Sequence, residues 1–221
     1  MKILNRFNGN VIFEFECETI KECLLKARER GANLRDIDLR GSNLCGSNLR
    51  DIDLWGANLC GADLRGSNLR DIDLRGSNLC GSNLWDADLW GANLCGANLW
   101  GANLRGSNLW GANLCGADLR GSNLCGANLY GANLCGANLW GATLWGEKLI
   151  KSPIYINAGL KWQIWITDKK IKIGCQIHTT TFWNEVSDEI ISRMDSEALE
   201  FWNKWKKPIL VMAKEHQKKD K

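Results

Sequence analysis

A leucine stands at every fifth position from Leu34 to Leu149, and this spacing dominates the hydrophobic pattern of the chain. Written as five-residue units, the segment begins GANLR DIDLR GSNLC and continues for 24 units over residues 31–150. The residue two before each leucine is alanine, serine or isoleucine, except for Glu147. A period of five fits neither an α-helix nor a flat strand, which repeat about every 3.6 and 2.0 residues. The pattern instead predicts a coil of short extended segments joined by tight corners, with two side chains of each unit pointing inward.

The remaining positions of the unit are almost as regular as the leucines. The residue before leucine is asparagine or aspartate, except for Thr143 and Lys148, and each corner carries glycine or aspartate. This A/S-N/D-L-x-G pattern resembles that of the pentapeptide-repeat proteins, and the resemblance extends over residues 31–150. It implies a mainly β fold, a right-handed quadrilateral β-helix with four units per coil. The 24 units would then form about six coils, in which residue n lies directly below residue n+20.

The inward positions are expected to form stacked columns in the core of this β-helix. Alanine or serine fits the second inward position because the bore is narrow, and the three isoleucines at this position should widen it locally. Asparagine and aspartate should hydrogen-bond to the backbone at the corners, as short polar side chains do in turns. One core column consists of Leu34, Leu54, Leu74, Leu94, Leu114 and Leu134.

Residues 1–30 precede the repeat and predict a β-hairpin followed by a helix. Apolar and polar residues alternate in Lys2–Phe7 and Val11–Glu16, which flank the typical hairpin turn Asn8–Gly9–Asn10. Thr19 can cap the helix, and Glu22 completes a capping box. We expect this segment to cap the β-helix, whose first coil would otherwise expose apolar side chains and unpaired backbone.

Residues 151–221 lose the five-residue period and predict a small α+β domain. A first helical stretch around Trp183–Met194 can be capped by Thr181 or Ser187. Ser196 can cap a longer helix, which Pro208 should kink or break. The expected strands are Tyr155–Asn157, Lys161–Thr167 and Lys170–Gln176, with turns at Asn157–Ala158–Gly159 and Asp168–Lys169.

This C-terminal segment is similar to a short domain of phage and prophage pentapeptide-repeat proteins. The similarity lies around Ile173–Gly174–Cys175 and in the Trp-rich stretch Phe201–Trp205. It implies no known activity. Cys175 and His178 have a metal-like spacing, but the only other histidine is His216, so we expect both residues to serve core packing and the protein to need no metal or cofactor.

The outward position after each leucine is where a functional surface could lie. Sorted with a period of 20, three of the four faces mix arginine, cysteine and tryptophan without order. On the fourth face two arginines precede an aromatic ladder, and Arg70 is placed to lie on Trp90 as a cation–π pair. Tryptophan, tyrosine and arginine dominate binding hot spots. The candidate protein-contact surface is therefore Arg50, Arg70, Trp90, Trp110, Tyr130 and Ile150.

Three other interpretations of the outward residues stay open. The aromatic side chains could simply shield the coil edges by stacking on one another. A second copy of the chain could bind them, which would give a homo-oligomer. A platform for single-stranded nucleic acid is less compatible with the nearby Asp51, Asp71 and Asp88. Stacked cysteines, such as Cys95, Cys115 and Cys135, have poor geometry for disulfides and lack a fourth metal ligand, so they are expected to be structural.

Composition and charge exclude several classes of function. The net charge of +3 divides into +1 for residues 1–30, −2 for residues 31–150 and +4 for residues 151–221, too little to indicate nucleic-acid binding. No apolar run approaches the roughly 18 residues of a membrane span, and the N-terminus lacks a leader pattern, which predicts a cytoplasmic protein of a bacterial or phage-infected cell. The chain contains no GxSxG, phosphate-binding loop or HExxH motif. We therefore expect no enzymatic activity.

These observations favour a rigid, non-enzymatic scaffold that binds another, unidentified protein through the aromatic face or the C-terminal segment. The resemblance also offers an alternative, because the quinolone-resistance members of the family bind DNA gyrase as DNA mimics. Those members present an acidic rod, whereas this repeat carries eight outward arginines. The near-identity of the units also fits a recently expanded or engineered array, in which the outward residues were never selected for binding.

Overall fold

The computed structural model describes residues 1–156 and 160–218 and divides the chain into two compact units. Unit 1 is Met1–Leu149 and unit 2 is Ile150–Lys221. The N-terminal segment and the repeat thus belong to one unit, and the repeat period ends at the boundary between the units. Each unit has its own buried core.

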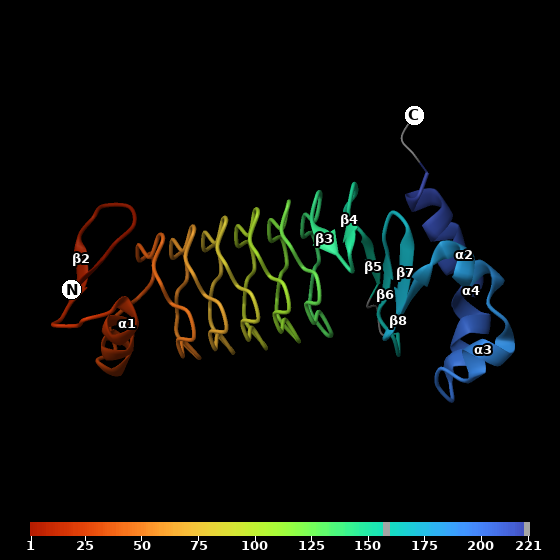
Figure 1. The fold of residues 1–221 in the computed structure, drawn as a ribbon, viewed down its shortest axis with the longest axis horizontal. Coiled ribbons are helices and arrows are strands. Elements are labelled where there is room, and N and C mark those ends of the chain that lie inside the picture. Colours follow the sequence, from red (N-terminus) through yellow and green to blue (C-terminus); the bar gives the residue numbers. More distant parts are fainter. Residues whose placement is uncertain (157–159, 219–221) are drawn as a thin grey trace. The chain divides into compact units, whose positions relative to one another are not determined.

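The repeat of unit 1 is a stack of coils that are linked by parallel backbone bridges (Figure 1). The bridges join residue n to residue n+20, from Asp38–Asn58 to Asn123–Thr143. Each unit also closes its own corner, as where Ser47 N–H donates to the carbonyl of Leu44 at 3.0 Å. A coil therefore takes 20 residues, or four units, which is the spacing that the resemblance to pentapeptide-repeat proteins implies.

The core of the repeat is formed by the leucines and by the small residues two positions before them. The six leucines of the predicted column, Leu34 to Leu134, are all at least 94% buried. Five serines beside them bond within the corner through their hydroxyls, as where Ser67 Oγ donates to the carbonyl of Leu64 at 2.7 Å; the other four are Ser77, Ser82, Ser107 and Ser122. Ile37, Ile52 and Ile72 are buried as well. These contacts confirm the inward and outward assignment of the five positions.

The corners require a left-handed backbone conformation, which explains their glycines. Gly46 has φ +67°, a region that residues with a Cβ rarely adopt. Aspartate takes the same conformation at four corners, with φ between +53° and +58°, at Asp36, Asp51, Asp71 and Asp86. Aspartate is one of the few residues that tolerates it, because its short polar side chain can bond locally.

The N-terminal segment forms the predicted hairpin and helix. Strands β1 (Lys2–Leu4) and β2 (Val11–Glu14) pair antiparallel and are shorter than predicted. Thr19 caps helix α1 (Ile20–Glu29), with its side chain accepting the Glu22 N–H at 3.2 Å. The Glu22 carboxylate in turn accepts the N–H of Glu18 at 3.0 Å, one residue earlier than a capping box requires.

Both ends of the repeat depart from its regular pairing. At the first coil, an antiparallel bridge joins Asn5 to Ile37, and the carbonyl of Leu4 accepts the Asp38 N–H at 2.8 Å. At the last coil, β3 (Thr143–Leu144) and β4 (Glu147–Lys148) form a short hairpin. This second hairpin was not predicted, although the irregular residues of the last two units lie in it.

Unit 2 contains a four-stranded antiparallel sheet in chain order, followed by three helices (Figure 1). Its core includes Ile164, Ile166, Trp183, Trp202 and Ile209. The strands are β5 (Ile154–Ile156), β6 (Ile164–Ile166), β7 (Lys170–Ile173) and β8 (Gln176–Thr179). The helices are α2 (Thr180–Glu185), α3 (Asp188–Ser192) and α4 (Ala198–His216).

Three predictions about the strands and turns of unit 2 need comment. The predicted strand Lys170–Gln176 ends at Ile173, because Gly174 turns the chain with φ +56° and starts the unpredicted strand β8. The turn at Asp168–Lys169 does join β6 to β7. The predicted turn Asn157–Ala158–Gly159 lies outside the described residues.

The helices of unit 2 correct the predicted boundaries. The first helical stretch is two helices, because Val186 adopts an extended conformation between α2 and α3. Ser187 caps α3 as predicted, whereas Thr179 rather than Thr181 caps α2. Glu197, not Ser196, precedes α4 and makes no side-chain cap bond.

Helix α4 continues through Pro208 without a break. Proline removes the hydrogen bond that its N–H would donate to the carbonyl of Lys204. Both residues lie on the exposed side of the helix, so water can satisfy this carbonyl. The predicted break is therefore wrong.

Candidate functional site

The fourth outward face of the repeat brings arginine and aromatic side chains into contact along one column. The guanidinium carbon of Arg70 lies 4.7 Å from the ring centroid of Trp90, which is the predicted cation–π contact. The rings of Trp110 and Tyr130 meet edge to face, with centroids 5.9 Å apart and planes at 78°. Ile150, the sixth predicted member, is the first residue of unit 2. We call the five members in unit 1, Arg50, Arg70, Trp90, Trp110 and Tyr130, the aromatic column.

The two ends of the aromatic column differ in charge. Arg50 lies 3.3 Å from a carboxylate oxygen of Asp51 and 3.5 Å from one of Asp71, so acidic neighbours balance its charge. Trp110 and Tyr130 are uncharged and are 48% and 60% exposed. Aromatic side chains with this exposure are what a partner protein can bury. The column thus provides a neutralised polar end and an apolar end.

Four outward arginines elsewhere bind the aspartate two positions earlier. In the clearest example, Arg75 Nη2 lies 2.6 Å and Nε 2.9 Å from the two carboxylate oxygens of Asp73. This bidentate bond is the main cause that holds the pKa of Asp73 below its usual range. The same pairing recurs at Asp38–Arg40, Asp63–Arg65 and Asp118–Arg120. The D-L-R spacing is a signal in the sequence that our interpretation missed.

The asparagine column forms two sets of hydrogen bonds. Each side-chain oxygen accepts a backbone N–H two residues later, as in Asn98 with Trp100 at 3.0 Å, which confirms the predicted corner bonds. The side-chain amides also bond between coils: Asn98 donates to Asn78, and Asn78 to Asn58, both at 3.2 Å. This ladder, which the sequence interpretation missed, ties neighbouring coils together outside the core.

The cysteines of the repeat are free thiols, and Cys95, Cys115 and Cys135 follow one another at intervals of one coil. The carbonyl of Cys115 accepts the Gly96 N–H at 2.9 Å, which sets Cys95 and Cys115 on neighbouring coils. Burial is the largest cause that raises the pKa of Cys115, followed by the thiols of Cys135 and Cys95. The Cys115 thiol is therefore a weak nucleophile at neutral pH.

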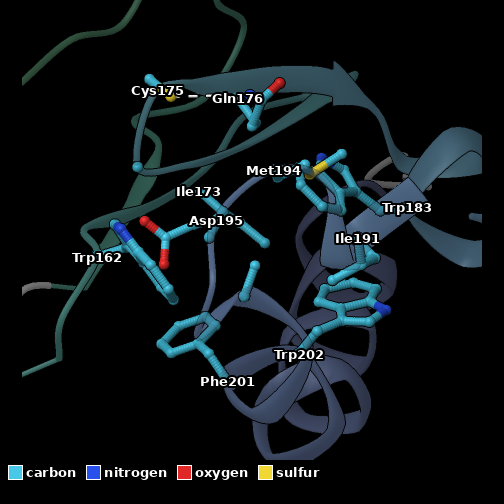
Figure 2. A pocket seen from close by; sticks show the side chains of 12 residues that line it. Trp162, Ile173, Cys175, Gln176, Trp183, Ile191, Met194, Asp195, Phe201 and Trp202 are labelled. Atoms are coloured by element: carbon cyan, nitrogen blue, oxygen red, sulfur yellow. Dashed lines mark hydrogen bonds between the residues drawn. The ribbon is translucent and has the colours of Figure 1, made fainter. Parts of the chain in front are cut away.

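A cavity of about 90 Å³ lies in unit 2 between the sheet and the helices (Figure 2). Its buried lining consists of Ile173, Trp183, Ile191 and Trp202, which also belong to the core of the unit. Partly exposed aromatic rings form another side, where Trp162 and Phe201 meet edge to face at 5.0 Å. The exposed residues of the lining are Cys175 and Asp195. The sequence did not reveal this cavity, because its lining comes from five separate segments.

Cys175 and His178 are not brought together as a metal site. The ring of His178 stacks on that of Phe182, with centroids 3.9 Å apart, and meets Trp183 edge to face. This packing was predicted for His178, and burial lowers its pKa. Cys175 is instead exposed beside the cavity. Among the described residues, no group of three or more histidine, cysteine or acidic side chains is placed to hold a metal ion.

None of the helices within residues 1–156 and 160–218 combines the length and the apolar character that crossing a membrane requires. The longest helix, α4, carries lysines along its length.

Comparisons with known proteins agree with the coil geometry. The family model "Pentapeptide repeats (8 copies)" matches residues 30–54, 46–79, 72–111 and 102–141, which together make up half of the chain. A search of curated proteins finds no match.

Several solved structures are similar to the repeat. The pentapeptide repeat protein Rfr23 from the cyanobacterium Cyanothece 51142 is 36% identical over 51% of this chain and 90% of that chain, with a TM-score of 0.42. The pentapeptide repeat protein alr5209 from Nostoc Pcc 7120 is 32% identical over 52% and 95% of the two chains, with a TM-score of 0.32. QnrB1, a plasmid-mediated fluoroquinolone resistance protein, is 21% identical over 49% and 61%, with a TM-score of 0.28. From the match to the family model, this chain belongs to the pentapeptide-repeat family, and its repeat has the β-helix fold of that family.

Proposed function

We propose that this protein is a non-enzymatic scaffold that binds another protein through the aromatic column. The observation that supports this most is the exposed edge-to-face pair of Trp110 and Tyr130, next to the Arg70–Trp90 pair. Rings that are already held by their neighbours lose little side-chain entropy when a partner covers them. The column can therefore contribute binding energy without first being ordered.

The remaining parts of the chain fit this proposal as supports of the column. We assign residues 31–150 to a right-handed quadrilateral β-helix of six coils, with residues 1–30 as its cap and residues 151–221 as a separate α+β domain. The support for the cap is the bonding of β1 to the first coil, through Asn5 and Leu4. Backbone bridges between coils and the asparagine ladders favour a rigid support.

The resemblance of Phe201–Trp205 and its neighbours to phage and prophage domains extends the proposal. It places the protein among the phage and prophage members, acting in the cytoplasm of a bacterial or phage-infected cell. No role for the C-terminal domain follows from this resemblance.

Paired substitutions test the contact surface. Trp110→Ser with Tyr130→Ser removes the apolar end of the column, whereas Trp100→Ser with Trp140→Ser removes rings of similar exposure, 57% and 62%, from another face. We expect only the first pair of substitutions to abolish capture of a partner protein from a bacterial lysate. If the partner is a second copy of the chain, only this pair should abolish the dependence of the sedimentation coefficient on protein concentration. Equal behaviour of the two pairs and the unmodified protein in both assays would remove the column as a contact surface.

The alternative function, DNA mimicry toward DNA gyrase, is less well supported by the surface. Mimicry requires rows of uncompensated negative charge, whereas Asp38, Asp63, Asp73 and Asp118 are each bound by an arginine. The likeness to QnrB1 is one of fold. A gyrase supercoiling assay separates the two proposals: inhibition at micromolar protein would favour mimicry, and unchanged supercoiling would remove it.

A further inference from the structure

We propose that the aromatic cavity of unit 2 binds a small organic cation, of the quaternary-ammonium class. This inference is independent of the aromatic column, because all residues that line the cavity lie between Trp162 and Trp202. Three features of the cavity carry it: the aromatic lining, the position of a carboxylate and the size of the space.

The lining presents several aromatic rings to one small space. Trp162, Trp183, Phe201 and Trp202 all border it, and Figure 2 shows them around the cavity with Met194 and Ile191 between. Aromatic faces attract cations through the ring quadrupole, and groups of such rings are the usual receptors for quaternary ammonium ions. A cation already lies against one of these rings, since Lys161 Nζ is 4.7 Å from the centroid of Trp162.

A negative charge stands at the exposed side of the cavity. The carboxylate of Asp195 is turned toward Trp162 (Figure 2). It accepts the backbone N–H of Glu197 at 2.9 Å, and this bond is the main cause that lowers its pKa and keeps it ionised. Lys161 compensates this charge only in part, because its ammonium is 3.5 Å from Asp195 and 2.7 Å from Glu197. A ligand cation would share Asp195 with Lys161, whose shorter contact is to Glu197.

The volume limits the occupant to a compact group. At about 90 Å³ the cavity is smaller than the cavity of about 150 Å³ that admits benzene in a protein core. A trimethylammonium head is similar in size to benzene, so it can enter this space only in part, with the rest of the group at the exposed side that Cys175 and Asp195 line; it has no N–H group to satisfy. The buried part of the lining offers such a head apolar contact, from Ile173, Ile191 and the rings.

The turn at Gly174 keeps the space in shape. A Cβ at this position would lie 2.8 Å from the Trp162 ring, and the backbone has φ +56°. Glycine therefore lets the β7–β8 turn pack directly on Trp162, which holds that ring at the side of the cavity. This close approach gives the site a fixed aromatic side.

Choline and its neutral carbon analogue, 3,3-dimethylbutan-1-ol, test the proposal. The two probes share shape and hydroxyl and differ in charge. Titrating each into the full-length ¹⁵N-labelled protein, and following the indole N–H resonances by NMR, should give saturable shifts with choline at least about tenfold tighter than the alcohol. Equal affinities would show an apolar cavity without cation selectivity, and the absence of saturable shifts with both probes would show that the cavity admits neither; either result overturns the proposal.

Matched variants locate the charge effect. Asp195→Asn keeps an oxygen acceptor for the Glu197 N–H and removes the charge, so it should weaken choline about threefold to fivefold and leave the alcohol unchanged. Asp188→Asn removes an equally exposed carboxylate of α3 that does not line the cavity, and should change neither. Phe201→Leu should weaken choline more than the alcohol. Identical effects of Asp195→Asn and Asp188→Asn on choline binding would refute the assigned site.

Discussion

The corner glycines of the repeat share one backbone conformation but have different surroundings, which allows a matched test of the coil geometry. Gly106 and Gly111 have φ +68° and +67°. A Cβ added at Gly111 meets nothing within 4 Å, whereas one added at Gly106 would overlap Asp86 Oδ1 and lie 3.2 Å from its Cγ. Asp86 occupies the corresponding corner one coil earlier. The cost of alanine at Gly106 therefore depends on a residue 20 positions away.

The two contributions can be separated in magnitude. Alanine in the left-handed region costs about 1–2 kcal/mol, and this cost applies to Gly106→Ala and Gly111→Ala alike. At Gly106 the Asp86 side chain must in addition rotate away from its preferred position, at about 0.5–1.5 kcal/mol. We therefore expect Gly106→Ala to destabilise the protein by about 1 kcal/mol more than Gly111→Ala. In the Asp86→Gly background this difference should disappear.

Urea unfolding of the single and double variants, followed by circular dichroism, measures these differences as shifts of the midpoint at an unchanged slope. Comparing each alanine variant with the protein that has the same residue at position 86, aspartate or glycine, gives the coupling free energy directly. Equal destabilisation by Gly106→Ala and Gly111→Ala would refute the stacking of corners with a 20-residue period. So would an undiminished difference in the Asp86→Gly background.

Three further predictions concern the core, the ion pairs and the thiols. Leu94 is 1% exposed, so Leu94→Ala should leave a cavity in the leucine column and destabilise the protein by about 3 kcal/mol in the same urea assay. A loss of stability below about 1 kcal/mol would contradict this packing. The lowered pKa of Asp73 means that its ion pair stabilises the fold above the usual aspartate pKa and that this stabilisation is lost as pH falls through the lowered value. Arg75→Gln should therefore reduce the loss of stability between about pH 5 and pH 2, measured by urea midpoints, and an unchanged pH profile would refute the assignment. Burial is the main cause that raises the pKa of Cys23 to about 11, so this thiol should resist iodoacetamide at neutral pH while the exposed Cys175 reacts. Mass spectrometry of peptides measures the labelling of each cysteine, and equal labelling rates would contradict the structure.

Sequence reasoning succeeded where one pattern encodes both local and long-range structure. In the repeat, each residue lies next to the residue 20 positions later, which has the same place in the following coil. The period therefore predicts which residues are in contact. The buried leucines, the corner bonds of Asn98 and the contact of Arg70 with Trp90 follow from that. What it missed within the repeat are contacts that depend on side-chain reach, such as the bidentate bond of Arg75 to Asp73.

Unit 2 shows the opposite situation. Its composition indicates strands and helices, and Ser187 caps α3 as predicted. Hydrophobic spacing alone, however, predicted a single helix where the structure has α2 and α3, which Val186 separates. It also predicted a kink or a break at Pro208, and there is no break, because exposure to water lets the helix continue. The extent of each element there depends on which neighbours cover it, and those neighbours have no fixed distance along the chain.

The sequence by itself therefore determined the five-residue unit with its inward and outward positions. The resemblance to pentapeptide-repeat proteins supplied the 20-residue coil, which stacks the buried columns and the aromatic column because a strict repeat makes each coil the template of the next. Only the tertiary structure decided that Arg50 lies beside Asp71 and how the Trp110 and Tyr130 rings meet. It alone also assembled the cavity of unit 2. Trp162 and Trp202 are 40 positions apart, and they border one space because the sheet and helices fold onto a shared core, a proximity that no local pattern encodes.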